Sequence, residues 1–292
     1  MSAVNLARAA EQEMSTEQSD LLVKQIDFPA RPETLTTLQA ELKRDDPDLR
    51  RVARLVGSDV ALTASVLRIA NAPAYAVARR CETVDHAIHM LGLKQVVTIV
   101  TGLILRKVLR TDGPQLTRFW DVSSKRAYAM SVLARDLKRV DADIAQSFGL
   151  FCDVGIPLLM ARFPDYKNTL GLCNDDTVRS FTQIEQSQHR TDHALIGGLM
   201  ARSWGIAQNV CLAIRLHHDY DVFQSPGVPE PVVRLIAMGL VAEVAIQKFA
   251  RLNRSTEWEK GGDAAAGALM LSNADVEEWI DRLVEGFALG TD

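Results

Sequence analysis

The sequence predicts an all-α protein, and three features of its 292 residues support this class. Apolar residues recur every three to four positions through most of the chain, which is the period of an amphipathic helix. Short polar breaks rich in Pro, Gly, Asp and Asn separate these stretches, and such residues cap or end helices. The β-branched run in the first half also continues at helical spacing. We therefore expect short helices joined by short turns.

The β-branched cluster from Val96 to Thr101 is the stretch most open to a different interpretation. Taken alone, it could form a buried strand. Its apolar positions, however, continue from Leu93 to Val108 without a turn signal, and a strand of that length would be unusual. We predict a helix here.

The N-terminal half divides into an extension and a set of short helices. Residues 1–19 favour helix but hold few large apolar side chains, so we expect them to be frayed or weakly helical. Pro32 is a plausible first helical position, and Asp45-Asp46-Pro47 should end one helix and start the next. Residues 20–112 are predicted to form an N-terminal helical subdomain, which ends at the break Thr111-Asp112-Gly113-Pro114.

The second half is predicted to hold a second helical subdomain over residues 113–250 and a helical tail over 251–292. A loop is expected at Cys173–Asp176, and Thr191 or Asp192 should cap a helix that Gly205 ends. The paired Gly197-Gly198 should let another helix approach closely, since glycine otherwise costs about 1 kcal/mol in a helix interior. The main predicted helices are Gln115–Val140, His193–Trp204, Ala207–His218, Val232–Phe249 and Val276–Phe287.

Composition narrows the class of protein. The chain has 47% apolar residues and a net charge of −4, so it can build a core and gives no reason to favour nucleic acid. Its four cysteines lie far apart, which suggests neither a zinc knuckle nor a disulfide framework. The first residues lack the pattern of a signal peptide, and we found no uninterrupted apolar run of about 18 residues. We expect a cytoplasmic protein that does not contact a membrane.

A small set of polar side chains stands out on otherwise apolar helices. A lone histidine in such a place is more often a satisfied core residue than a ligand. Imidazole, carboxylate and thiolate together are nevertheless what a transition metal prefers. The sequence does not show whether these residues converge. They are Cys152, Asp153, His193, His217 and His218.

Several motifs together resemble the HDOD domain of bacterial signalling proteins, over roughly residues 20 to 250. The first is the run Phe28-Pro-x-x-Pro-Glu-Thr-Leu, and a long segment from Asp46-Pro-Asp-Leu to Ile69-Ala-Asn-Ala follows it. The later motifs are Ala87-Ile-x-x-Leu-Gly-Leu, Trp120-x-x-Ser123, Gly149-Leu-Phe-Cys-Asp-Val-Gly155, His193-x-x-x-Gly197, Trp204-Gly-Ile and His217-His218-Asp219.

The resemblance implies an all-helical relative of the HD-superfamily metal phosphohydrolases, in a family generally regarded as catalytically inactive. The superfamily's first histidine corresponds to Val122, and its His-Asp pair corresponds to Cys152-Asp153. The two further histidines of its dinuclear members match His193 and the His217-His218 pair. The final aspartate is expected near Met238-Gly239-Leu240, where no acid is present, and the nearest one is Glu243.

These departures bear on metal binding, because hydrolysis at such a site needs an ion held by enough ligands to acidify a water. Val122 cannot replace an imidazole. Cys152, Asp153, His193 and one of His217 or His218 could hold zinc or iron, but we expect no bound metal or other cofactor. In the favoured interpretation Asp153 pairs with backbone amides or an arginine, and Cys152 is a small buried apolar group. His217 and His218, at a helix C-terminus, would be stabilised as cations.

The leading functional hypothesis is a pseudo-phosphohydrolase: a non-catalytic adaptor that transmits signals through contacts with other signalling proteins. Its contact surface would be the groove between the N-terminal helices and the degenerate HD half, shaped by Val122, Ser123 and the residues retained from the ancestral site. One alternative is a residual metal-dependent phosphohydrolase acting on a nucleotide or cyclic dinucleotide. Another is a binder of an anionic small molecule, held by His217, His218 and a nearby arginine.

Overall fold

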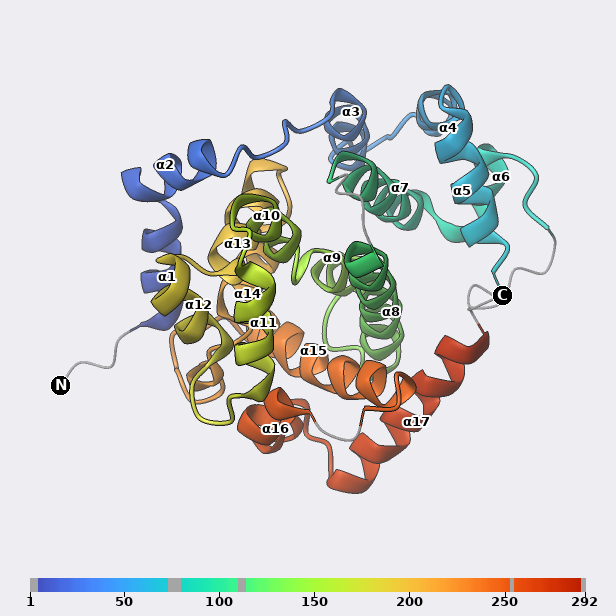
Figure 1. The fold of residues 1–292 in the computed structure, drawn as a ribbon. Helices are drawn as coiled ribbons and strands as arrows, with labels where there is room; N and C mark the ends of the chain where they lie inside the picture. The colour runs from blue at the N-terminus through green and yellow to red at the C-terminus, as the bar shows by residue number, and fades with distance from the viewer. Residues whose placement is uncertain (1–4, 73–79, 110–113, 253–254, 290–292) are drawn as a thin grey trace. The chain divides into compact units, whose positions relative to one another are not determined.

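The computed structural model describes residues 5–72, 80–109, 114–252 and 255–289, and these ranges contain helices and no strand. The predicted all-α class is confirmed (Figure 1). Two compact units make up the chain and are described separately. Unit 1 comprises Met1–Phe28 and Thr111–Glu285, and unit 2 comprises Pro29–Arg110 and Gly286–Asp292.

Unit 2 is built from five consecutive helices that pack around one apolar core. The β-branched cluster lies in the last of them, so the helix predicted there is confirmed, and Val96 and Val100 are fully buried. Asp48 and Asp59 cap two of the helices through their side chains, and both caps satisfy backbone amides of a first turn. The helices are α3 (Glu33–Leu42), α4 (Leu49–Gly57), α5 (Val60–Ala70), α6 (Val84–Leu91) and α7 (Leu93–Val108).

Unit 1 is larger and holds the predicted HD-like part. Its long helix α8 packs along α9 and α15, while α13 packs against α10 and α14 (Figure 1). The helices are α1 (Leu6–Met14), α2 (Glu17–Gln25), α8 (Pro114–Leu137), α9 (Ala142–Phe151), α10 (Gly155–Arg162), α11 (Tyr166–Asp175), α12 (Phe181–His189), α13 (His193–Ser203), α14 (Gln208–Leu216), the 3-10 turn η2 (Tyr220–Phe223), α15 (Glu230–Phe249), α16 (Thr256–Leu269) and α17 (Asn273–Leu289).

The N-terminal extension, predicted over residues 1–19 to be frayed or weakly helical, forms packed helices from Leu6 onward. Helix α1 packs on α13 and α14, and its small apolar face is buried. Polar contacts hold it as well, because Arg215 Nε lies 2.7 Å from Glu13 Oε2. Helix α2 also belongs to unit 1, so the N-terminal subdomain begins at Pro29 rather than at residue 20. The buried residues of α1 are Ala7, Ala10 and Met14.

Two other predictions in the second half need correction. The predicted tail over residues 251–292 is not separate, because α16 packs along α15 and η2 in unit 1. Gly261 permits this contact, since a Cβ there would lie 2.8 Å from the Tyr220 ring. The loop predicted at Cys173–Asp176 is helical up to Asp175, because Cys173 is fully buried and packs against Phe181. The subdomain boundary predicted at residue 112 lies close to the division between the two units, which falls between Arg110 and Thr111. These residues lie outside the described ranges.

The close approach predicted for Gly197-Gly198 is confirmed. A Cβ on Gly197 would lie 3.1 Å from the Ile214 side chain, and one on Gly198 would lie 3.2 Å from the Cys211 carbonyl oxygen. Helix α14 therefore packs directly on the backbone of α13. This packing sets the distance between the start of α13 and the end of α14, where two of the candidate histidines lie.

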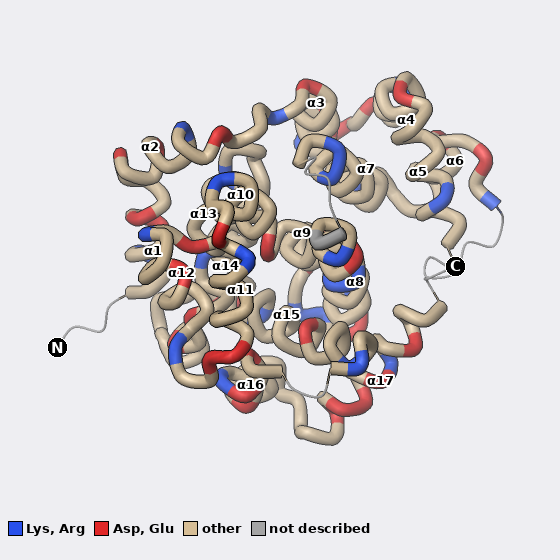
Figure 2. Tube along the Cα trace, in the orientation of Figure 1, with Lys and Arg blue, Asp and Glu red and all other residues tan. Residues whose placement is uncertain are grey.

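Charge is distributed unevenly along the sequence. Residues 29–110 hold 13 Lys and Arg against 8 Asp and Glu, although the whole chain carries a net charge of −4. The negative excess therefore comes from the segments that form unit 1. Figure 2 shows Lys and Arg as well as Asp and Glu scattered over the helices, so net charge alone does not locate a site.

Candidate functional site

A pocket of about 770 Å³ lies within unit 1 and contains most of the predicted site residues. Its walls are mainly apolar, and its polar side chains include several from the residues singled out in the sequence. A volume of this size falls in the range of small-molecule pockets. The polar groups include Arg126, Cys152, Asp153, His193, His217, His218 and Glu243, and the apolar ones include Phe119, Phe148, Met160, Leu240 and Phe249.

Asp153 reaches this pocket from the turn between α9 and α10. Cys152 is the C-cap of α9, and Gly155 begins α10. A Cβ built on Gly155 would lie 2.1 Å from the backbone carbonyl oxygen of His193, so only glycine allows this contact. The start of α10 therefore lies directly against the start of α13, which brings Asp153 close to His193.

Arg126 is the principal partner of Asp153. Its Nη1 lies 2.6 Å from Asp153 Oδ2, and its Nη2 lies 2.6 Å from Glu243 Oε2 on α15. The Arg126 side chain is only 8% exposed, so the guanidinium is a buried cation between two carboxylates. This agrees with the interpretation in which Asp153 pairs with an arginine, and the sequence did not identify which one.

His193 and His217 approach the other oxygen of Asp153. His217 Nε2 lies 3.4 Å and His193 Nε2 lies 3.8 Å from Asp153 Oδ1. The two Nε2 atoms are 3.2 Å apart. Three potential ligand atoms thus form a compact triangle on the Oδ1 side of the carboxylate.

The outer nitrogens of both imidazoles are held by acceptors. His193 Nδ1 lies 2.7 Å from Glu185 Oε2, and His217 Nδ1 lies 2.6 Å from the Ile214 carbonyl oxygen. Glu185 is fully buried, accepts the backbone amide of His193 and also accepts the Tyr166 hydroxyl. Both rings are therefore fixed with Nε2 directed at the partner ring. Their separation of 3.2 Å is short enough for one proton or one ion to lie between the two nitrogens.

The ionisation of the site follows from burial and neighbouring charge. Burial disfavours every charged form here. For His193 the Glu185 and Asp153 carboxylates outweigh burial and raise its pKa to about 9. For His217 the Cys152 and Asp153 side chains outweigh burial and raise its pKa to about 10. The pKa of Asp153 is held well below its usual value, because Arg126 and His217 outweigh burial.

His218 belongs to a second cluster beside the first. Its Nδ1 lies 2.6 Å from Glu257 Oε2, and Glu257 also accepts the Tyr220 hydroxyl at 2.5 Å and pairs with Lys260 at 2.9 Å. Burial and the nearby charge of His217 lower the pKa of His218. Of the two histidines expected to be stabilised as cations, the surroundings therefore favour the cation for His217 and the neutral form for His218.

The triangle on the Oδ1 side fits a metal ion. Atoms about 2.1 Å from one tetrahedral ion lie about 3.4 Å from one another, and the three observed separations are 3.2, 3.4 and 3.8 Å. A carboxylate or backbone carbonyl on the outer nitrogen is also the usual support of a ligating histidine. Cys152 lies within 4.8 Å of the Asp153 and His217 ligand atoms and could supply a fourth donor. Asp153, His193 and His217 would hold the ion, which would supply Lewis acidity.

The Oδ2 side of Asp153 does not fit an ion in the same way. Val122, at the position of the superfamily's first histidine, lines the pocket with an apolar side chain. At the position of the final aspartate, a Cβ on Gly239 would lie 3.1 Å from the Phe148 ring, which occupies the space a longer side chain would need. Arg126 and Glu243 fill this side instead.

The structure thus brings together all but one of the predicted site residues. Val122, Cys152, Asp153, His193, His217 and His218 line the same pocket, whereas Ser123 is buried in α8 and is not among its lining residues. Sequence reasoning missed Arg126, Glu185 and Glu257. A signal for Arg126 was present, because it follows the buried positions Trp120 and Ser123 on one stripe of α8.

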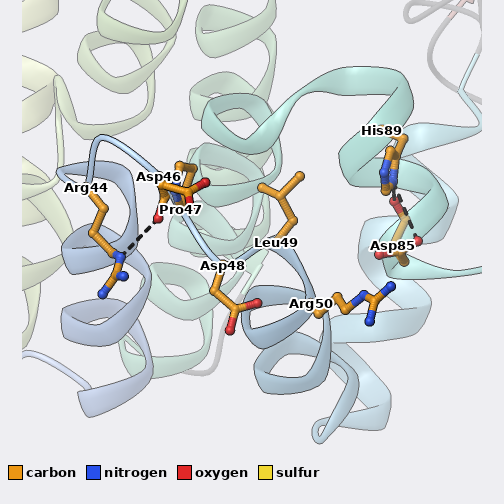
Figure 3. Close-up of a pocket in the computed structure, with 8 residues that line it drawn as sticks. All are labelled: Arg44, Asp46, Pro47, Asp48, Leu49, Arg50, Asp85 and His89. Carbon is orange, nitrogen blue, oxygen red and sulfur yellow. Dashed lines mark hydrogen bonds and ion pairs between the residues drawn. The ribbon is translucent and has the colours of Figure 1, made fainter.

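A second hollow, of about 650 Å³, lies in unit 2 and offers less chemistry (Figure 3). Two of its polar side chains bond backbone carbonyls: Arg44 Nε donates to the Asp46 carbonyl oxygen at 3.2 Å, and His89 Nδ1 lies 2.7 Å from the Asp85 carbonyl oxygen. Asp46, Asp48 and Arg50 also line it. The side chains of Asp85 and His89 are more than half exposed, which is typical of a solvated face.

The fold and the pocket define an all-helical domain in which histidines and carboxylates from several helices meet. The HDOD domain model matches residues 28–220, and the chain belongs to this family.

Three solved structures share the fold at low sequence identity. A candidate signal transduction protein from Marinobacter aquaeolei VT8 gives a TM-score of 0.71 at 23% identity, over 92% of this chain and 59% of that one. A candidate phosphohydrolase from Shewanella amazonensis SB2B gives 0.69 at 22% identity, over 92% and 96%. An HDOD domain protein of unknown function from Geobacter sulfurreducens gives 0.67 at 20% identity, over 97% and 94%.

One curated relative is an uncharacterized protein of Treponema pallidum (strain Nichols). It is 24% identical over 226 residues, which are 76% of this chain and 42% of that protein. The chain therefore spans less than half the length of this relative.

The segment Ala142–Arg162 is long and apolar enough to cross a membrane by composition alone. It comprises α9, the turn that carries Asp153, and α10, and 67% of its most apolar window is buried inside the protein. We assign it to the core of unit 1.

Proposed function

We propose that this chain is a non-catalytic HDOD protein that transmits a signal through contacts with other signalling proteins. The observation that carries the proposal is the contact of Arg126 with both Asp153 and Glu243, at 2.6 Å each. A guanidinium cannot deliver a water to a phosphate ester, because it has no acceptor and does not lose its proton in proteins. The carboxylate that the superfamily uses for metal binding serves here as the partner of an internal cation.

The histidines of the pocket support the same conclusion. His193 contacts Glu185, His217 contacts Asp153, and His218 contacts Glu257. Histidines paired with carboxylates within the protein contribute to a fixed shape and are less able to attract an anionic substrate. This pairing also weakens the alternative of an anion held by His217 and His218.

The contact surface stays a prediction. A pocket with apolar walls could accept an apolar side chain of a partner protein. Exposed apolar residues in unit 1 near its opening include Leu252, which is 48% exposed and lines the pocket. The cytoplasmic location expected from the sequence is part of the same proposal.

A metal-dependent phosphohydrolase is the second candidate, and the triangle of Asp153 Oδ1, His193 Nε2 and His217 Nε2 is the observation that favours it. An ion held there could polarise a phosphate oxygen.

Turnover measurements separate the two candidates. The full chain would be loaded with Mn²⁺, Fe²⁺ or Zn²⁺ and assayed against nucleotides and cyclic dinucleotides. The adaptor proposal expects no turnover above the buffer rate with any ion. Turnover that disappears in Asp153→Ala would contradict it and establish the hydrolase.

A further inference from the structure

The carboxylate of Asp153 separates two places where positive charge can lie. Its Oδ2 contacts Arg126 at 2.6 Å, and its Oδ1 faces His217 and His193 at 3.4 and 3.8 Å. A bridging carboxylate of this kind can serve two cations, one on each oxygen. In this chain the cation on the Oδ2 side is part of the protein.

Both terminal nitrogens of the Arg126 guanidinium bind a carboxylate. Nη1 bonds Asp153 and Nη2 bonds Glu243, so one guanidinium joins α8 to the turn before α10 and to α15. Asp153 is 16% and Glu243 25% exposed, and both face the same buried charge. Without it, Glu243 and the Oδ2 atom of Asp153 would lose their shared cation in a largely buried place, which is costly.

We propose that Arg126 is a built-in cation that takes the place of a metal ion on the Oδ2 side of Asp153. The chain then holds at most one divalent ion, on the Oδ1 side between His193 and His217. It binds one more ion when Arg126 is replaced by a neutral residue. This inference rests on the proposed function, in which the fixed guanidinium of Arg126 makes the site non-catalytic.

Exclusion is the physical basis of the proposal. An ion bound to Asp153 Oδ2 would lie about 2.0–2.2 Å from that oxygen, in the space that the Arg126 nitrogen occupies at 2.6 Å. Two positive charges in that space repel strongly at low dielectric. Val122 and Gly239 supply no ligand that could hold an ion at another point on this side.

Ion counting tests the proposal on the full chain. Wild type, Arg126→Met, Arg126→Gln and Arg126→Lys would be stripped with chelator, dialysed against Mn²⁺ and analysed for metal per chain. Mn²⁺ is chosen because it has little preference for thiols, so the four cysteines should not contribute. Tryptophan fluorescence would establish that each variant is folded.

The expected result is at most one Mn²⁺ per wild-type chain and one more than wild type in Arg126→Met and Arg126→Gln. Arg126→Lys, which keeps the charge, should match wild type. In Arg126→Met, the added change Glu243→Gln should remove the extra ion.

Two results would overturn the proposal: two ions in the wild type, or no extra ion in either folded neutral variant. If both neutral variants fail to fold, the wild-type count still decides. These outcomes differ from failure of the proposed function, which would appear as turnover.

Discussion

Replacement of Gly155 by alanine should destabilise unit 1 more than alanine at any of the other glycines whose surroundings the structure describes. A Cβ at this position would lie 2.1 Å from the His193 carbonyl oxygen and 2.8 Å from its carbonyl carbon and Cα. These are backbone atoms of α13, so no side chain can rotate away. Overpacking of a core commonly costs about 1–3 kcal/mol, and a clash of more than 1 Å with rigid backbone should cost at least about 3 kcal/mol.

Urea denaturation would measure this cost. All four tryptophans, at positions 120, 204, 258 and 279, lie in segments of unit 1, so their fluorescence reports the unfolding of that unit. The matched control is Gly171→Ala in α11, where a Cβ meets nothing within 4 Å. This control should be neutral or stabilising by up to about 1 kcal/mol. If Gly155→Ala loses less than 1 kcal/mol relative to wild type, the close contact between α10 and α13 is not as described.

Three further predictions concern charge and thiol chemistry. Arg126→Met should lower the free energy of unfolding by about 3 kcal/mol, since it removes the buried cation that joins Asp153 to Glu243. Lys248→Met, at an exposed pair, should cost less than about 1 kcal/mol. Equal losses in urea would refute the buried contact of Arg126. The pKa of His193 is raised to about 9 from an ordinary 6.5, so the contribution of its protonated form to stability, about 3 kcal/mol, is complete below pH 6.5 and is lost as pH rises through 9. The free energy of unfolding of chelator-treated protein should therefore fall over this pH range. The same pH dependence in His193→Gln would contradict the raised pKa of His193. Burial raises the pKa of Cys173 to about 12 and the pKa of Cys211 to about 11. A thiol reagent at pH 8 should therefore label both cysteines only after denaturation. Rapid labelling of either cysteine in native protein would contradict their burial.

Local sequence signals were sufficient for most helices. The period of apolar residues placed α7 despite its β-branched composition, because the buried positions continued for the length of a helix. The cap of α13 was one of two predicted, and the Asp192 side chain accepts the Leu195 amide at 2.8 Å. Helical periods and caps depend on residues close to one another in the sequence, so they can be recognised without knowledge of the packing.

Long-range contacts explain what the sequence did not predict. Helix α1 looked too poor in large apolar residues to pack, yet its alanines allow a close approach to α13 and α14. Residues Glu185 and Arg126 lie on α12 and α8, and their roles depend on how these helices meet α13 and α15. A buried charge on an apolar stripe indicates that a partner exists, but only the packing shows which one.

Crystallography of the wild-type chain with Mn²⁺ is the most direct test of the central claim, that Arg126 takes the place of an ion beside Asp153. Anomalous scattering locates each manganese relative to the two carboxylate oxygens. The account predicts at most one peak, between Asp153 Oδ1, His193 and His217, with the guanidinium still bridging Asp153 Oδ2 and Glu243. A manganese peak between Asp153 Oδ2 and Glu243, with Arg126 displaced, would contradict it.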